Sequence, residues 1–195
     1  MPAPTSRTTA KQATRERILA AARRRFEDQG FTGTSSQDVA EAAGVSHGAV
    51  FVHFGTRQVL IEAATDLVLG PAETELRTRL AGARDLRALL ETHLDALAPH
   101  EAFHARLAGE RAVLPGAVRE RLEAFEASVA SQLGGAAIAL GAGALRKGVS
   151  PPFSLNAWMA LVAYYLAHRE RLTPRGHVLA QRRTELVEGF LCLVA

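Results

Sequence analysis

The segment from Thr34 to Phe54, TSSQDVAEAAGVSHGAVFVHF, constrains the fold most, because it reads as two short helices joined by a tight turn. Thr34 is a candidate N-cap, and Gln37 follows it at the spacing of a capping box. Gly44 stands where a helix C-cap needs positive φ, and Ser46 can cap the second helix. The segment therefore predicts a helix-turn-helix, whose second helix enters the major groove of DNA.

Both expected helices carry their apolar residues on one side. The inward-facing residues are Val39, Ala40, Ala43, Ala49, Val50 and Phe54. The second helix begins with small or polar residues, which bring its backbone close to base edges; these are Ser46, His47, Gly48 and Ala49. Two short amphipathic helices around a glycine turn also occur in bundles that bind no nucleic acid, so a purely structural role is the alternative.

A longer, gap-free pattern surrounds this segment, from Thr14 to Asp66. Its characteristic residues are Ile18-Leu19-Ala20-Ala21-Ala22, Phe26, Gly30-Phe31, Thr34-Ser35, Asp38-Val39-Ala40, Ala43-Gly44-Val45-Ser46, Gly48, Phe51, His53-Phe54 and Leu60. In this pattern the chain resembles the TetR family of bacterial transcriptional regulators, over about a quarter of its length. It departs from the family at Phe51, where a Tyr hydroxyl usually reaches a phosphate, at Arg57, which is usually Lys, and at Ser36, which is unusually polar.

The resemblance implies an all-α fold. Residues 1–56 would form a helix-turn-helix DNA-binding domain, and residues 57–195 a helical domain for effector binding and dimerisation. It also implies a repressor that a small, largely apolar effector releases from a double-stranded DNA operator. In the family the last two helices pair with those of a second subunit, which makes 155–171 and 175–193 the predicted seam of a homodimer. An apolar strip in the last helix fits this seam: Leu179, Leu186, Phe190 and Leu193.

We expect Thr34, His53 and Arg57 to contact the DNA backbone, and Gln37, Ser46 and His47 to contact base edges. The full predicted DNA-binding set is Thr34, Ser36, Gln37, Ser46, His47, Gly48, Ala49, Phe51, His53 and Arg57. Charge supports this placement. The chain has a net charge of +3, and residues 1–57 hold eight basic and five acidic side chains, so the whole surplus lies with the helix-turn-helix. A solvated basic face is the alternative.

Composition excludes several other classes. No apolar run is long enough to span a bilayer, and the polar start MPAPTSRTTAKQ lacks the core of a signal peptide, so a cytoplasmic location without membrane contact is expected. The single cysteine, Cys192, rules out an intrachain disulfide and a cysteine-based metal cluster. No catalytic triad, paired carboxylates or phosphate loop stands out, so neither enzyme activity nor a cofactor is predicted.

Helical periodicity continues to the end of the chain, and nine helices are expected. Thr9 and Gln12 form a capping-box pair that opens the first helix, which Gly30 ends, and residues 1–8 are expected to be a disordered, basic arm. Gly70-Pro71 should kink or break the fourth helix. The remaining helices are expected at Asp85–Ala98, Pro99–Val113, from Pro115 into the Ala/Gly-rich stretch that ends at Gly143, at Leu155–Arg171 behind a Ser154 cap, and at Arg175–Leu193.

Three histidines, His93, His100 and His104, are spaced so that one uninterrupted helix would place them on one face. With Glu101 nearby they raise the possibility of a divalent metal site, but Pro99 is expected to break the helix between the first histidine and the others. The plain interpretation is three partly exposed or hydrogen-bonded histidines, and a role as polar points in an effector pocket is favoured over metal binding. The predicted effector-binding set combines two of these histidines with aromatic and apolar residues on the lining helices: His93, Leu97, Phe103, His104, Phe125, Trp158, Leu161 and Tyr165.

Two other functions stay open at this point. The chain could be an all-helical metal-binding or enzymatic domain in which the helix-turn-helix is only structural. It could also be a DNA-binding dimer without control by a small molecule.

Overall fold

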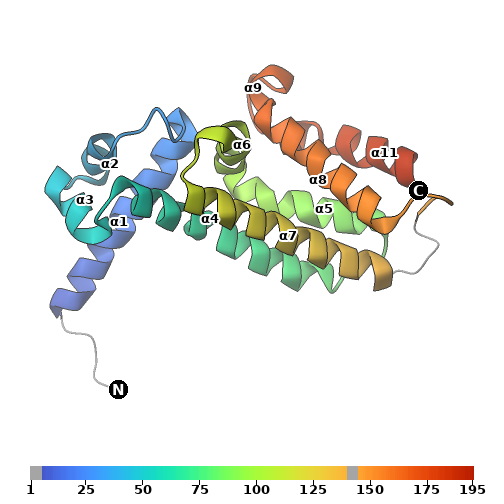
Figure 1. The fold of residues 1–195 in the computed structure, drawn as a ribbon, viewed down its shortest axis with the longest axis horizontal. Coiled ribbons are helices and arrows are strands. Elements are labelled where there is room, and N and C mark those ends of the chain that lie inside the picture. Colours follow the sequence, from blue (N-terminus) through green and yellow to red (C-terminus); the bar gives the residue numbers. More distant parts are fainter. Residues whose placement is uncertain (1–5, 140–144) are drawn as a thin grey trace.

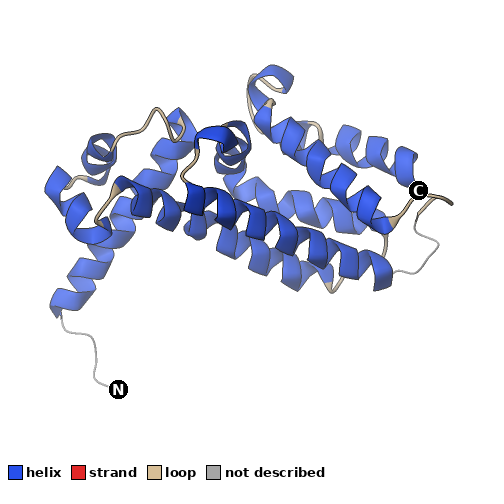
Figure 2. Ribbon diagram, viewed as in Figure 1, coloured by secondary structure: helices blue, strands red, loops and turns tan. Residues whose placement is uncertain are grey.

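The computed structural model describes residues 6–139 and 145–195, and within these residues every regular element is helical (Figure 1, Figure 2). In chain order they are α1 (Ser6–Gln29), α2 (Ser36–Ala43), α3 (His47–Phe54), α4 (Arg57–Leu80), α5 (Leu86–Leu97), η1 (Ala98–His100), α6 (Glu101–Gly109), η2 (Arg111–Val113), α7 (Gly116–Ala139), α8 (Pro151–Ala167), α9 (Arg169–Leu172), α10 (Val178–Gln181) and α11 (Arg183–Val194). The predicted all-α fold is confirmed. The nine expected helices correspond to α1–α8 and α11, and the single-turn α9 and α10 are separate from α8 and α11 within the last two expected helices.

The molecule is elongated, with α1, α2 and α3 gathered at one end and α5, α7, α8 and α11 at the other (Figure 1). The long helix α4 runs from the first group into the second, packing against α1, α5 and α7. A second link lies beside it, because α6 packs on α1 as well as on α8. Of the described helices, none is both long and apolar enough to cross a membrane.

Local cap chemistry fixes the ends of the short N-terminal helices. Gly44 has φ 64° at the end of α2, and the Ser46 hydroxyl accepts a hydrogen bond from the Ala49 amide at the start of α3, as predicted. The predicted cap of α2 is wrong by one residue. Ser35, not Thr34, is the N-cap, and it forms a capping box with Asp38 rather than with Gln37. Thr34 is instead buried, and its hydroxyl donates to the carbonyls of Arg25 and Gly30.

Helix α1 begins at Ser6, before the Thr9 cap that the sequence suggested, and ends at Gln29 where Gly30 adopts φ 78°. Ile18, Ala22 and Phe26 repeat every four residues along this helix, and all three are buried on its inner side. The predicted N-terminal arm lies largely outside the described residues.

Helix α4 passes through Gly70-Pro71 without a break, which corrects the predicted interruption. Pro71 is exposed, whereas its neighbours Leu69, Ala72 and Leu76 are buried against other helices. Pro71 has no N–H to donate to the carbonyl of Leu67, and because both residues are exposed, water can reach that carbonyl. Packing on the opposite side then keeps the two halves of α4 continuous.

Helix α8 also differs from its predicted start. Ser150 is the N-cap, and Pro151 and Pro152 occupy the first turn, where a missing N–H costs little. Ser154, the predicted cap, lies inside the helix and donates its hydroxyl to the Ser150 carbonyl. Helix α7 continues through Gly134-Gly135 to Ala139, and the rest of the predicted Ala/Gly-rich stretch up to Gly143 lies outside the described residues.

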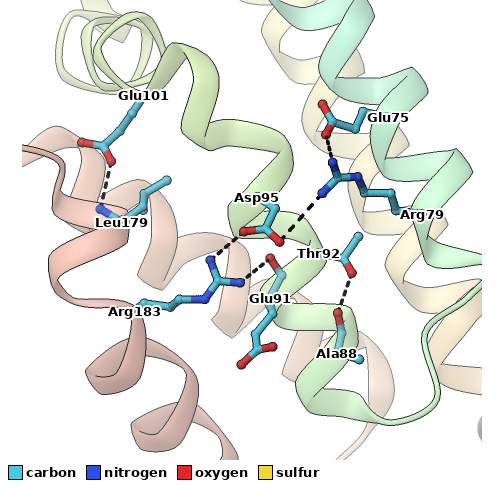
Figure 3. A network of polar contacts seen from close by, with 9 residues as sticks. All are labelled: Glu75, Arg79, Ala88, Glu91, Thr92, Asp95, Glu101, Leu179 and Arg183. Atoms are coloured by element: carbon cyan, nitrogen blue, oxygen red, sulfur yellow. Dashed lines mark hydrogen bonds and ion pairs between the residues drawn. The ribbon is translucent and has the colours of Figure 1, made fainter.

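The last predicted helix is divided and starts later. Gly176 has φ 97°, which a right-handed helix excludes, so the first turn begins at Val178. The buried carboxylate of Glu101 accepts hydrogen bonds from the amides of Val178 (2.8 Å) and Leu179 (3.0 Å) and so caps α10. The same region is tied to the bundle by Asp95 of α5, which lies 2.6 Å from Arg183 of α11 and 3.9 Å from Arg79 of α4 (Figure 3).

The apolar strip that was assigned to the dimer seam belongs mostly to the core of one protomer. Leu179, Leu186 and Phe190 are buried, and only Leu193, 68% exposed, is available to a partner. Here the spacing of seven, four and three residues identifies the face of the helix that packs inside the protomer. Periodicity alone could not show this, because burial within a chain and burial between chains produce the same pattern.

Candidate nucleic-acid interface and effector pocket

Helix α3 presents its outer face to solvent while its inner face is anchored. Val50 and Phe54 are buried, and the Arg15 guanidinium of α1 lies over the Phe54 ring at 4.9 Å. Opposite them, His47 and Phe51 are exposed and pack edge to face, with ring centroids 4.9 Å apart. A rigid helix with exposed side chains in its first turns has the form needed to enter a major groove.

The predicted base-reading residues lie on this exposed side. Ser46, His47 and Gly48 are exposed at the start of α3, and Gln37 is exposed on α2, where its amide donates to Glu41. Ala49 and His53 are partly buried. Sequence reasoning missed Val52, which is 76% exposed. The pattern contained the necessary information, because Val52 lies midway between the inward-facing Val50 and Phe54 and must point to the other side of the helix.

Three predicted DNA contacts take part in contacts within the protein. Thr34 is 2% exposed and Ser36 is 8% exposed, so both side chains belong to the interior. The Arg57 guanidinium donates to the carbonyl oxygens of Thr34, through Nε at 3.2 Å and Nη2 at 3.0 Å, and of Phe31. Arg57 therefore holds the segment between α1 and α2, which we call the 30–34 loop.

A carboxylate that the sequence did not indicate binds the same loop from the other side. Glu110, directly after α6, accepts hydrogen bonds from the amides of Phe31 and Thr32, each at 3.0 Å, and from the Thr32 hydroxyl at 3.2 Å. A Cβ at Gly30 would lie 2.1 Å from Glu110 Oε1, so the close approach requires glycine. Arg106 of α6 adds bonds to the carbonyls of Glu27 and Asp28 at the end of α1.

A cavity of about 460 Å³ lies between α5, α6, α7 and α8. Four of the predicted effector residues line it: His93, Leu97, His104 and Phe125. Most of the remaining lining is aliphatic, and Glu123, Glu126 and Asn156 are its other polar members. The size and the largely apolar lining are typical of small-molecule sites.

The two histidines of the lining are buried and neutral. Burial lowers the pKa of His93 from 6.5 to about 4. Burial, together with repulsion from His93 and His100, lowers the pKa of His104 to about 3. Trp158 does not line the cavity. Its Nε1–H donates to Nδ1 of His93 at 2.9 Å and so supports a residue that does.

The other predicted effector residues lie elsewhere. Phe103 is fully buried and packs edge to face on Phe31, with centroids 5.4 Å apart. The Tyr165 hydroxyl donates to Glu185 at 2.5 Å, and Leu161 is half-buried against the core of the bundle.

The expected helix break at Pro99 is present, since α5 ends at Leu97 and α6 begins at Glu101. It separates His93 from His100, which contacts Glu27 and Arg23 instead. Across residues 6–139 and 145–195, no group of three or more His, Cys, Asp or Glu side chains is placed to hold a metal ion.

Sequence similarity to known proteins covers only part of the chain. Residues 18–64 match the sequence model described as "Bacterial regulatory proteins, tetR family". The chain is similar to the regulator TtgR of Pseudomonas putida, with 42% identity over 55 residues, 28% of this chain and 26% of that protein. It is also similar to the regulator AcrR of Shigella flexneri, with 36% identity over 74 residues, 36% of this chain and 34% of that protein. The chain thus matches about a quarter to a third of the length of these relatives.

Similarity of fold extends over nearly the whole chain. The crystal structure of NalD, the secondary repressor of the MexAB-OprM multidrug efflux pump in Pseudomonas aeruginosa, matches with a TM-score of 0.72 and 25% identity, over 95% of this chain and 98% of that chain. The regulator PfmR of Thermus thermophilus matches with a TM-score of 0.71 and 21% identity, over 90% of this chain and 97% of that chain.

Proposed function

Because the chain belongs to the TetR family, we propose that it is a DNA-binding transcriptional repressor that leaves its operator when a small, largely apolar effector fills the cavity between α5 and α8. The observation that carries the proposal is the exposed first turn of α3, held in place by the buried Val50 and Phe54. His47 and Gln37 supply base contacts from this end of the molecule.

The repressor acts as a homodimer, which places two copies of α3 about 34–36 Å apart over a near-palindromic site. Exposed apolar side chains on α8 and α11 support this pairing, because large apolar groups on one surface favour association. They are Phe153, Tyr164 and Leu193, with 65%, 45% and 68% of their area exposed. The two helices pack side by side (Figure 1). We expect their exposed faces to form the dimer seam.

Effector binding shifts the population toward a protomer geometry that fits the operator less well. Two helices connect the cavity with the DNA-binding end. Helix α4 packs against α1 at the DNA-binding end and against α5 and α7, two helices that line the cavity. Helix α6 carries His104 at the cavity and leads directly into Glu110, which binds the 30–34 loop. A displacement of α6 therefore reaches α2 through a short path of contacts.

The test begins with selection of bound sequences from a random duplex library by the purified wild-type protein, followed by gel shifts on the selected operator and its single-base variants. His47→Ala is expected to flatten the sequence preference, with each lost base contact worth about 1–3 kcal/mol. The exposed substitution Thr78→Ala on α4 is the matched control, and its preference should equal the wild-type preference. Failure to enrich any sequence, or an unchanged preference in His47→Ala, would overturn the proposal.

A further inference from the structure

The hydrogen-bonding state of His93 is fixed by its neighbour. An indole N–H can only donate, so His93 Nδ1, which receives it from Trp158 at 2.9 Å, is the unprotonated nitrogen. The proton of the neutral ring is therefore on Nε2. Within the described part of the chain, this buried Nε2 has no hydrogen-bond partner. The cavity wall thus contains a donor that the folded protein leaves unsatisfied.

His104 adds a second unsatisfied nitrogen to the same cavity. Its ring lies beside Phe125, with centroids 5.8 Å apart, and its Nε2 is likewise buried without a partner among the described residues. Both rings line the cavity, and both nitrogen atoms are out of reach of water. Buried polar groups in folded proteins are nearly always paired, so two unpaired atoms in side chains that line one apolar cavity indicate a missing ligand group.

The charges around the cavity argue against a charged ligand. No Lys or Arg is among the residues that line it, so a carboxylate or phosphate would find no counter-ion. The acidic side chains Glu123 and Glu126 lie at the more exposed edge and are already paired with Arg111, at 3.4 and 2.6 Å. A cation would therefore meet neutral imidazoles inside and engaged carboxylates outside. Transfer of an unpaired charge into such a site is strongly unfavourable.

We infer that the effector is an uncharged, largely apolar molecule with a hydrogen-bond acceptor oxygen, of the ketone, ester or lactone class, and that this oxygen binds His93 Nε2–H. The inference rests on the proposed effector role of the cavity and specifies its ligand. Because Nε2 is buried, the oxygen reaches it by local movement of the cavity lining, which includes the flexible side chain of Met159. Trp158 acts as a positioning residue, because its N–H sets the tautomer that donates.

Trp158 also provides the assay, since it is the only tryptophan of the chain and lies directly behind His93. Its fluorescence is followed while the full-length protein is titrated, without DNA, with four probes that share one ring: cyclooctanone, cyclooctane, cyclooctylammonium and cyclooctanecarboxylate. In a cavity without hydrogen bonding, cyclooctane would bind best because it gains most on leaving water. We expect the reverse order, with cyclooctanone bound about tenfold more tightly than cyclooctane, the effect of one neutral hydrogen bond. The two ions should not bind measurably.

Two substitutions separate a specific contact from a general effect on the fold. His93→Gln keeps an acceptor for Trp158 and a donor toward the cavity, so the preference for the ketone should survive. His93→Leu removes both and should make cyclooctane the tighter ligand. His177→Leu, at a histidine whose side chain is 70% exposed, is the matched control and should behave as wild type.

The wild-type comparison alone can overturn the inference, even if His93→Leu fails to fold. Tighter binding of cyclooctane than of cyclooctanone, best binding of either ion, or binding of none of the four probes would each refute it. The outcome is independent of the operator experiment. Loss of DNA binding with an intact ketone preference would refute the proposed function and leave the cavity chemistry standing.

Discussion

Stability should fall steeply in mild acid because of the two buried histidines. Their folded-state pKa values are about 4 for His93 and about 3 for His104, against 6.5 in an unfolded chain. Above pH 6.5 both rings are neutral in both states and add no pH dependence. Below it, the unfolded chain takes up protons that the folded chain does not, so the free energy of unfolding decreases as the pH falls toward 4.

The expected size of the effect follows from these shifts. For each histidine, a difference of one unit between the unfolded-state and folded-state pKa values corresponds to a loss of up to about 1.4 kcal/mol in the free energy of unfolding. Between pH 7 and pH 5, each ring therefore lowers the free energy of unfolding by about 2 kcal/mol, and the two together by about 4 kcal/mol. That loss is a large part of the total stability of an ordinary domain, which is about 5–15 kcal/mol.

Urea unfolding at pH 7 and at pH 5, at one fixed protein concentration, measures this difference. Each of His93→Gln and His104→Gln should reduce the loss by about 2 kcal/mol relative to wild type. Carboxylates that titrate in the same range are common to all variants and cancel in the comparison. His47→Ala, which removes an exposed ring, is the control and should leave the loss unchanged. If the free energy of unfolding falls equally between pH 7 and pH 5 in wild type and in both cavity variants, the two rings are not buried and neutral, and the reasoning fails.

Further predictions concern the DNA-binding end and the dimer seam. Phe51→Tyr should tighten operator binding by about 0.5–1.5 kcal/mol for all sequences alike, because it adds a phosphate-directed hydroxyl, and gel shifts test this. Glu110→Gln should accelerate hydrogen exchange of the amides at 31–32 by about tenfold or more, since a bond to a charged acceptor is worth about 1.5–3 kcal/mol; unchanged exchange by NMR would contradict the role of the carboxylate. Leu193→Glu should convert the proposed dimer into monomers in light-scattering measurements, whereas Ile138→Glu, at another exposed apolar residue, should not.

Features set by a few neighbouring residues were predictable from the sequence. Gly44 and Ser46 were placed correctly at their helix ends, because a C-cap needs positive φ and an N-cap needs a short side-chain acceptor, whatever surrounds them. The start of α4 at Arg57 behind Thr56 follows the same logic. The helix-turn-helix was therefore available from local chemistry alone.

Features set by tertiary packing could not be predicted from the sequence. Thr34 and Ser35 are both competent caps, and the choice between them is made by α1, whose carbonyls at Arg25 and Gly30 bind the Thr34 hydroxyl. Likewise, the apolar strip of α11 could not be divided between core and dimer seam by its period, because both faces need the same residues at the same spacing. For a related reason only four of the eight predicted effector residues line the cavity. Periodicity selects buried positions but does not indicate which of them border empty space.

The contacts that connect the cavity with the DNA-binding end depend on chain segments far apart in the sequence. Glu110 binds amides that are 78 and 79 residues away, and no local pattern distinguishes it from an ordinary surface glutamate. Its partner in effect is Arg57, since one side chain holds the amides of the 30–34 loop and the other holds its carbonyls. The loop is thus fixed between an acidic group that follows α6, which lines the cavity, and a basic group from α4, which packs against the cavity helices α5 and α7. A ligand that moves α6 away from α4 would increase the distance between these two groups, and the loop that precedes α2 would then lose one of the two sets of bonds.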